Sequence, residues 1–285
     1  MIELIHEDLS KYTTIRIGGI ANRLLIPENR DELTEVIREK RPVFFIGGGS
    51  NLLISNGATE LVVSLRDFDQ SIESVGGGKF RVGASVRLPK LIQYINEEGY
   101  GGIEYLCNVP GLVGGAVAMN AGTGEKENKS ISDYVISVDV IRNGEEITMM
   151  KEECAFFHRD SFFRSHPSNI IVSVLFQFPK MAKEKSARAK EEKMRYYREH
   201  QDPSNPNFGS VFRVRNHKIM AVTKMFKIGK RVHFSGKTEN WIINEGGTYS
   251  DAIRAIRIVE ELHKLLRKKC VREVVVWDLN KRNQC

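Results

Sequence analysis

Residues 46–54 have the sequence Ile46-Gly47-Gly48-Gly49-Ser50-Asn51-Leu52-Leu53-Ile54, which places three glycines between two apolar runs. Because glycine has no Cβ, consecutive backbone N–H groups can converge on an anion here, and the hydroxyl and amide that follow add further donors. The stretch predicts a cradle for a diphosphate or, alternatively, a tight turn between two strands. It is not a Walker loop, because no Gly-Lys-Ser/Thr follows, and it lacks the GxGxxG spacing.

A second cluster of small residues follows at Val109-Pro110-Gly111-Leu112-Val113-Gly114-Gly115-Ala116-Val117-Ala118-Met119-Asn120-Ala121-Gly122. Its proline fixes the entry, and the small residues 114–118 allow a backbone or a flat ring to approach closely. Two such loops in the first half of the chain indicate a long cofactor with a diphosphate in its middle. The alternative interpretation is close packing of a helix against a strand.

The composition is that of an ordinary globular chain. The 285 residues are 41% hydrophobic and 28% charged, which excludes a collagen-like, coiled-coil or mostly disordered protein. This length favours two packed units or one α/β unit with an appended domain. No apolar run approaches the roughly 18 residues that span a bilayer, and the first twelve residues do not resemble a signal peptide. We therefore expect a cytoplasmic protein without a membrane partner.

Four scattered cysteines, none in a CxxC pair, predict reduced thiols and no metal site; they are Cys107, Cys154, Cys270 and Cys285. The net charge of +7 is confined to two segments. Residues 181–200 hold seven basic and four acidic side chains, and residues 253–273 hold seven and three. These segments are either solvated helix faces or a surface that attracts anions. A nucleic-acid partner is not expected, because few aromatic residues interleave with the charge.

Periodicity divides the chain into three parts. A helix from Glu28 to Ile37 between apolar strands, among them 42–46 and 61–65, makes residues 1–66 a small βαβ-like lobe. Residues 67–180 contain a strand at 80–88, a helix at 88–98, a hairpin turning at Asn143-Gly144 and a strand at 170–178.

The charge alternation of residues 181–200 suits a solvated helix, and it marks a domain boundary. The part beyond it, 181–285, begins with a turn cluster at 202–206. It continues with a helix that Ser250 would cap and ends in one strand, Val271 to Trp277.

Six motifs in a fixed order resemble the UDP-N-acetylenolpyruvoylglucosamine reductases, the MurB family of flavoenzymes. They are KYTTIRIGG, IGGGSNLLI, NVPGLVGGAVAMNAG, HRDSFF, FGSVF and NWIIN…REV, and the resemblance spans residues 9–277. The glycine motifs are shared with the wider FAD fold of the vanillyl-alcohol-oxidase (PCMH) type. The resemblance implies an α+β fold: a two-lobed FAD-binding domain, 1–66 and 67–180, followed by a C-terminal α/β substrate-binding domain at 181–285, in a monomer.

The resemblance also implies the cofactors and their contacts. FAD would lie between the two lobes, NADPH would reduce it and leave, and an enolpyruvyl nucleotide sugar would replace NADPH in the same site. The implied cofactor-binding residues are Gly47, Gly48, Gly49, Ser50, Asn51, Leu52, Pro110, Gly111, Gly114, Gly115, Asn120, Gly122 and Ile171.

The chemistry requires a cation, because hydride addition to an enol ether builds negative charge on its carboxylate. Arg159 of HRDSFF matches the family's arginine and can grip both carboxylate oxygens. Ser210 of FGSVF matches the general acid, which must lie within hydrogen-bond reach because a serine is a poor acid. Glu273 of REV matches the glutamate that assists the grip. Outside the family, these residues suit an Arg159–Asp160 pair, a Gly-Ser turn and an outward-facing strand residue.

On the substrate side, Lys237 and Asn240 match positions that line the family's substrate site. The chain departs from the family pattern at Val214, Arg215 and Thr238, which are expected to be substrate contacts. The departures leave a related nucleotide sugar, reduced by a paralogue on the same flavin fold, as the alternative.

Overall fold

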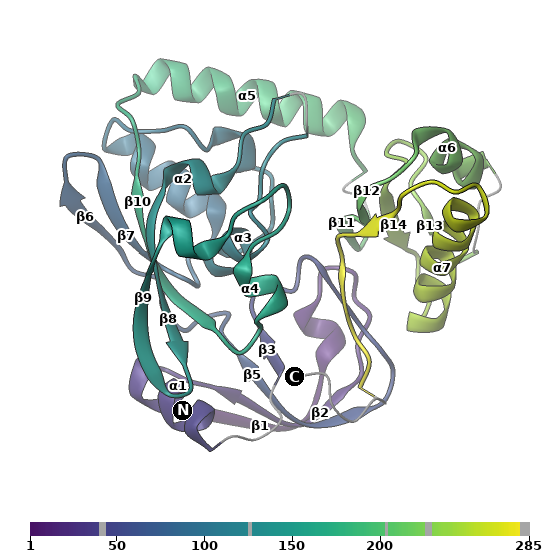
Figure 1. Ribbon diagram of the computed structural model, residues 1–285, viewed down its shortest axis with the longest axis horizontal. Coiled ribbons are helices and arrows are strands. Elements are labelled where there is room, and N and C mark those ends of the chain that lie inside the picture. Colours follow the sequence, from purple (N-terminus) through teal and green to yellow (C-terminus); the bar gives the residue numbers. More distant parts are fainter. Residues whose placement is uncertain (40–43, 125–126, 203–204, 226–229, 280–285) are drawn as a thin grey trace.

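The computed structural model describes residues 1–39, 44–124, 127–202, 205–225 and 230–279. Figure 1 shows two lobes side by side and a third unit set apart from them. Two connections reach this unit: one follows helix α5, and the other is the returning C-terminal segment. The site lies where these three parts meet.

The first lobe holds a four-stranded sheet. In sheet order its strands are β1 (Ile2–Asp8), β2 (Ile20–Ile26), β5 (Ala58–Ser64) and β3 (Phe44–Ile46). Helix α1 (Arg30–Arg38) begins where the Asn29 side chain accepts a hydrogen bond from the Glu32 N–H. Strands β2 and β3 both run parallel to β5, which confirms the predicted βαβ arrangement. The strand predicted at 42–46 begins with Pro42 and Val43, which lie outside the described residues.

The second lobe holds a five-stranded antiparallel sheet. In sheet order its strands are β6 (Ile72–Gly76), β7 (Lys79–Gly83), β10 (Ile170–Gln177), β8 (Val135–Arg142) and β9 (Glu145–Met150). Asn143 and Gly144 both have positive φ, 54° and 78°, which confirms the predicted hairpin turn.

Three helices pack on this sheet: α2 (Leu88–Glu97), α3 (Val113–Ala118) and α4 (Phe162–Ser165). Helix α2 confirms the helix predicted at 88–98 and buries Leu91, Ile92 and Ile95 in the largest core cluster.

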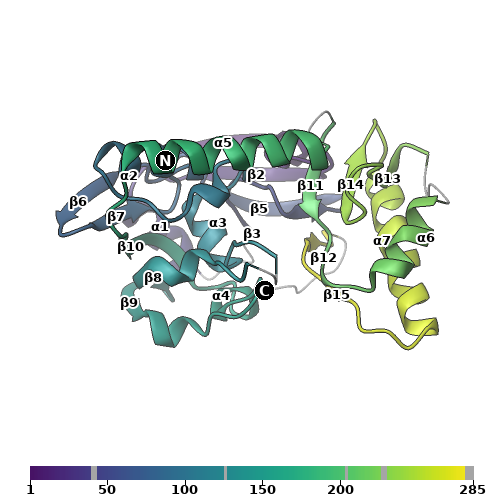
Figure 2. The ribbon, with the colours of Figure 1, turned by 90° about the horizontal axis from the view of Figure 1, so that it is seen from above.

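Helix α5 (Lys183–His200) confirms the predicted solvated helix, since Ser186 is its one buried residue. It packs across α2 and the short 3₁₀ helix Glu104–Leu106, so it belongs spatially to the second lobe. Figure 2 shows the helix running along that lobe, with its C-terminal end toward the third unit.

The third unit combines two small sheets with two helices. The first sheet orders β11 (Asn207–Ser210), β14 (Trp241–Asn244) and β13 (Val232–Phe234), and the second pairs β12 (Phe212–Val214) with β15 (Val271–Arg272). Helices α6 (His217–Met225) and α7 (Tyr249–Leu265) complete it. The predicted Ser250 cap is wrong: Thr248 caps α7, because its side chain and that of Asp251 bond each other's backbone N–H in a capping box.

The single strand predicted at 271–277 is also wrong. The segment is two strands, β15 in the third unit and β16 (Val275–Trp277), which pairs in parallel with β4 (Leu52–Ile54) of the first lobe. Between them the N–H groups of Glu273 and Val274 both point to the Val211 carbonyl, at 2.7 and 3.3 Å. The chain therefore crosses from one unit to another at Glu273.

Cys107, Cys154 and Cys270 form no disulfide, and Cys285 lies outside the described residues. The described residues bring together no group of His, Cys, Asp or Glu side chains that could hold a metal ion. Among the described helices, none combines the length and apolarity that a bilayer span needs.

Candidate active site

A cavity of about 840 Å³ lies where the lobes and the third unit meet. It brings together most of the residues predicted from sequence: Gly47, Gly48, Gly49, Ser50, Asn51, Leu52, Pro110, Gly111, Gly114, Gly115, Gly122, Arg159, Ile171, Ser210 and Glu273. Asn120, Lys237 and Asn240 do not line it. Both glycine clusters and the three predicted catalytic residues thus share one space.

The glycines of this cavity serve two different needs. Gly49 has φ +62°, and a Cβ there would lie 1.8 Å from the Tyr12 carbonyl oxygen, so the chain itself requires glycine. Gly122 is similar, because a Cβ would meet the Lys129 carbonyl at 2.1 Å. By contrast, a Cβ on Gly115 would meet nothing within 4 Å, and one on Gly47 only a leucine methyl at 3.8 Å. These two glycines keep open a surface that faces the cavity.

Several buried polar atoms at the cavity wall suit a polar ligand. Among the described residues, Thr14 Oγ1, the Tyr105 hydroxyl and Asn108 Oδ1 have no hydrogen-bond partner, and all three residues line the cavity. A buried polar atom without a partner costs about 1–3 kcal/mol, which a ligand bonded there would recover. Burial raises the pKa of Tyr105, so its hydroxyl remains a hydrogen-bond donor at neutral pH.

The charge of the cavity is predominantly positive. Of the described residues that line it, four are basic, Arg16, Arg159, Arg164 and Lys193, and one, Glu273, is acidic. Such a wall attracts ligands that carry phosphates or carboxylates.

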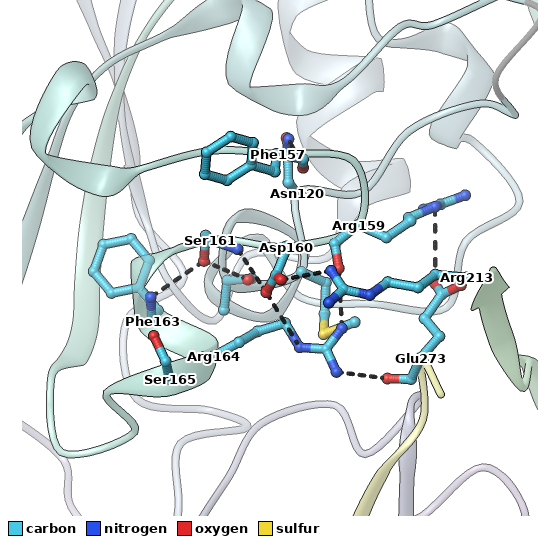
Figure 3. A network of polar contacts seen from close by, with 12 residues as sticks. Asn120, Phe157, Arg159, Asp160, Ser161, Phe163, Arg164, Ser165, Arg213 and Glu273 are labelled. Atoms are coloured by element: carbon cyan, nitrogen blue, oxygen red, sulfur yellow. Dashed lines mark hydrogen bonds and ion pairs between the residues drawn. The ribbon is translucent and has the colours of Figure 1, made fainter. Parts of the chain in front are cut away.

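Arg159 projects from the loop before α4 with a left-handed backbone, φ 54°. Its Nη2 donates to the Gly122 carbonyl at 2.6 Å, and its Nε lies 3.8 Å from Glu273 Oε1. The alternative expectation, a pair with Asp160, is not what the structure shows. The Asp160 carboxylate instead contacts Arg164 and Arg213 (Figure 3).

Glu273 lies between β15 and β16 and is 9% exposed. Its carbonyl accepts hydrogen bonds from Asn51 Nδ2 at 3.2 Å and Arg164 Nη2 at 3.1 Å, which tie it to the first glycine loop and to α4. Burial raises the pKa of its carboxyl, and the nearby Arg159 and Arg164 guanidiniums partly oppose this. The side chain faces the cavity, so it is not an outward-facing strand residue.

Ser210 ends β11 directly after Gly209, which has φ +70°. The Gly209 N–H donates to Asn207 Oδ1 at 3.1 Å, and the β11–β14 register is irregular between Asn207 and Ser210. Such an irregularity re-aims a side chain. Ser210 lines the cavity together with Phe208, and Phe208 also packs into the core of the third unit.

Of the three predicted residues outside the cavity, Asn240 and Asn120 support its walls and Lys237 does not. The Asn240 amide donates to the Phe212 carbonyl at 2.9 Å and accepts from its N–H at 3.1 Å, which fixes the strand after Ser210. Asn120 Nδ2 donates to the Phe157 carbonyl at 2.7 Å, next to the loop of Arg159. The Lys237 side chain is exposed.

The three departures from the family pattern do not line the cavity either. Val214 lies on β12, and Arg215 Nε lies 3.6 Å from Glu239 Oε1. The Thr238 hydroxyl donates to the His200 carbonyl at 2.6 Å, which joins the third unit to the end of α5.

Sequence reasoning missed the part of α5 that reaches the cavity. Lys193 and Tyr197 of α5 and its C-cap residue Gln201 line the cavity at intervals of four residues, the spacing of a single helix face. Gln201 Oε1 also accepts from Asn108 Nδ2 at 3.3 Å. The four-residue spacing can be seen in the sequence, but the sequence does not show that this side of α5 faces the cavity. Arg16, Arg164 and Trp241 were missed as well.

Comparisons with known proteins point to one family. Residues 21–150 match the family model described as "FAD binding domain". The chain is 32% identical to the UDP-N-acetylenolpyruvoylglucosamine reductase of Moorella thermoacetica, over 96% of this chain and 93% of the relative. It is 31% identical to the reductase of the same name from Thermotoga maritima, over 95% of this chain and 97% of the relative. The crystal structure of the Thermus caldophilus reductase (MurB) superimposes with a TM-score of 0.79 at 27% identity and covers 97% of this chain and 98% of that one.

The two kinds of glycine lead to a prediction. Gly49→Ala should lower the free energy of unfolding by about 3 kcal/mol, because strain and a backbone clash add together. Gly115→Ala should change the stability of the flavin-free protein by less than about 1 kcal/mol, yet weaken FAD binding at least about tenfold by filling space at the wall. Denaturant unfolding and flavin titration measure the two effects. Equal effects of both substitutions on stability would contradict this division.

The raised pKa of Glu273 predicts a pH-dependent stability. Below the ordinary glutamate pKa of about 4, the carboxyl is protonated in both states, so wild type and Glu273→Gln should unfold alike. As the pH rises through the raised folded-state pKa, ionisation favours the unfolded wild type, so the Gln variant should become the more stable of the two. Melting temperatures from pH 4 to 9 test this, with Glu73→Gln on exposed β6 as control. A difference that does not depend on pH would contradict the buried carboxyl.

Proposed function

The chain belongs to the UDP-N-acetylenolpyruvoylglucosamine reductase family, and from this membership and the geometry of its cavity we propose that it reduces UDP-N-acetylglucosamine enolpyruvate to UDP-N-acetylmuramate, a peptidoglycan precursor. It is an FAD-dependent oxidoreductase with an α+β fold, whose FAD-binding domain is of the PCMH type. One observation supports the proposed reaction above the others. Arg159, Ser210 and Glu273, from three separate stretches of chain, line the same cavity as both glycine clusters.

The residues present fit FAD. The first glycine loop can offer backbone N–H groups to a diphosphate. Gly47 and Gly115 leave room for a ligand to approach the backbone closely. The buried polar atoms without a protein partner could form hydrogen bonds with the cofactor. A bound FAD would supply the hydride chemistry, with NADPH as the source of the hydride and the enol ether as its acceptor. Across the whole cycle, one hydride and one proton add to the C=C bond, and NADPH becomes NADP⁺.

Arg159 and Glu273 would hold the carboxylate on which charge develops. A guanidinium stabilises that charge by paired hydrogen bonds, and it gains most in a cavity that excludes water. Glu273 with its raised pKa keeps its proton more readily than an exposed glutamate. It can therefore donate a hydrogen bond to the substrate carboxylate where an ionised side chain would repel it.

Ser210 would protonate the carbon next to that carboxylate. Its position after Gly209, at the end of β11, puts it on the third unit, in the wall of the cavity that the glycine loops also line. A carbon that carries the charge of an enediolate-like state is a strong enough base to take a proton from an alcohol held within hydrogen-bond reach.

We also propose the division of labour among the parts. Residues 1–66 and 67–180 would bind FAD. Within 181–285, α5 packs on the second lobe and β16 on the first, and the remaining third unit would bind the nucleotide sugar, with Lys237 and Asn240 supporting the substrate side. Helix α5 packs on the second lobe, and its Lys193 lines the cavity. The basic face of this helix would therefore bind phosphate groups of the ligands, and we propose no nucleic-acid partner for it. The protein would act as a cytoplasmic monomer.

A related nucleotide sugar is the alternative substrate. Oxidation of the reduced enzyme by a panel of nucleotide sugars, followed at the flavin absorbance, separates the two. UDP-N-acetylglucosamine enolpyruvate should react fastest, and a faster reaction with another sugar would refute the proposed substrate.

Ser210→Ala should separate the two half-reactions. Flavin reduction by NADPH should stay within about 2-fold of wild type, while flavin oxidation by the enolpyruvyl sugar should slow by about 10²–10⁴-fold, the usual value of a general acid. Stopped-flow absorbance measures both, and Ser74→Ala, on the exposed strand β6, serves as the control. Equal loss in both half-reactions would remove Ser210 from the role of proton donor.

Arg159→Lys should slow the same second half-reaction by about 10²-fold, because a single ammonium cannot bond both carboxylate oxygens and the Gly122 carbonyl as the guanidinium can. The same stopped-flow measurement, at several sugar concentrations, also shows whether binding weakens. A lysine variant with full turnover would exclude Arg159 from the site.

A further inference from the structure

One guanidinium bonds to the backbone of two residues to which the proposed reaction assigns roles. Arg164, on α4, donates from Nη1 to the Arg159 carbonyl at 2.9 Å and from Nη2 to the Glu273 carbonyl at 3.1 Å. Figure 3 shows its side chain between the two segments. Arg159 and Glu273 are far apart in sequence, so this side chain is a direct physical link between them.

The other side of the Arg164 guanidinium faces an acid. Its Nε lies 3.8 Å from Asp160 Oδ1, and the other oxygen, Oδ2, accepts from Arg213 Nη1 at 2.5 Å. Asp160 is itself held, because its Oδ1 accepts from the Ser161 N–H at 3.1 Å. Arg213 lies on β12, which follows Ser210 closely in sequence. The Asp160 carboxylate therefore connects the loop of Arg159 to the strand beyond Ser210.

The backbones of Arg159 and Glu273, which Arg164 bonds, both depend on hydrogen bonds from side chains elsewhere in the chain. Arg159 has a left-handed backbone, which costs a non-glycine residue of order 1–3 kcal/mol and persists only where contacts hold it. Glu273 lies between two strands and outside both ladders, so its carbonyl depends on side-chain donors. A displacement of about 1 Å at such residues can cost about 10²-fold in rate.

We propose that Arg164, oriented by Asp160, is a positioning residue that sets the placement of Arg159 relative to Glu273. The inference rests on the proposed function, since the placement matters for the half-reaction in which the enolpyruvyl carboxylate is held. Arg164 acts through the two backbones that it bonds. Asp160 supplies the counter-charge that a partly buried guanidinium requires, because burial lowers the pKa of Arg164 and Asp160 opposes that effect.

Three variants test the proposal in the flavin-loaded enzyme: Arg164→Gln, Arg164→Lys and Asp160→Asn. Flavin reduction by NADPH should stay within about 2-fold of wild type, whereas oxidation by UDP-N-acetylglucosamine enolpyruvate should slow by about 10²-fold in Arg164→Gln. Arg164→Lys should be nearly as slow, because one ammonium cannot bond two carbonyls and a carboxylate together. Asp160→Asn, which keeps the shape but removes the charge, should slow the same step.

Arg81→Gln is the matched control, because it breaks another Arg–Asp pair of the second lobe: Arg81 Nη1 lies 2.5 Å from Asp139 Oδ2, outside the cavity. It should leave both half-reactions near wild type. A loss of flavin reduction equal to the loss of flavin oxidation in the Arg164 variants, or a lysine variant with the wild-type rate, would overturn the positioning role.

A second readout does not depend on turnover. The basic side chains near the Glu273 carboxyl are those of Arg159, Arg164, His158 and Arg215, and each of them opposes the rise in its pKa that burial causes. Titration of the ¹³C-labelled glutamate side chain by NMR should therefore show a further upward move of that pKa in Arg164→Gln. An unchanged titration would refute the placement of Arg164. A wild-type enzyme that the sugar fails to oxidise would refute the proposed function alone, and the titration would still decide this inference.

Discussion

The parallel pairing of β16 with β4 is the contact on which the site depends. Strand β4 follows the first glycine loop directly, so the strand that pairs with it lies against that loop. The Val275 N–H donates to the Asn51 carbonyl at 3.0 Å, and Asn51 Nδ2 returns a hydrogen bond to the Glu273 carbonyl. A chain that entered the third unit after α5 thereby closes back on the first lobe and brings a carboxyl to the cavity. The core of the third unit also packs against Ile15, Ile17 and Leu53 of the first lobe, but it is this pairing that sets Glu273 beside the first glycine loop.

The glycine clusters show why a functional loop and a structural loop are hard to separate. The first cluster is, in local structure, the tight strand-to-strand turn that was the alternative to a phosphate cradle, since it joins β3 to β4. It also lines the cavity, so the two interpretations are not exclusive. The same holds for the second cluster, where a Cβ on Gly114 would lie 3.0 Å from Ala84 Cβ while Gly115 faces open space. Of these two adjacent glycines, Gly114 is therefore required by packing against Ala84, whereas Gly115 keeps open the surface that faces the cavity.

Local signals in the sequence predicted local structure well. The Asn143-Gly144 turn follows from φ preference, helix α2 from apolar spacing and the solvated helix α5 from charge alternation, and each of these signals acts over a few residues. The strand at 271–277 was predicted as one element because its apolar residues continue through Glu273. The break arises from two different partner strands, which no local pattern records. The prediction that Asn240 contacts substrate came from the family motif, which does not record that its amide bonds the Phe212 backbone behind the cavity wall. The family motifs identified the three catalytic candidates, and only the fold shows that they meet.

The two carboxylates near the centre of the site have different surroundings, which suit different tasks. Asp160 lies between two guanidiniums and accepts a 2.5 Å hydrogen bond from one of them, so it serves as a fixed counter-charge for Arg213 and Arg164. Glu273 is more deeply buried, and its oxygen stands 3.8 Å from Arg159 Nε, a separation too long for a strong hydrogen bond. Burial therefore dominates its pKa. A carboxyl whose pKa is raised by burial, beside a guanidinium that it pairs with only loosely, is the arrangement that the proposed reaction would use to hold a second, incoming carboxylate.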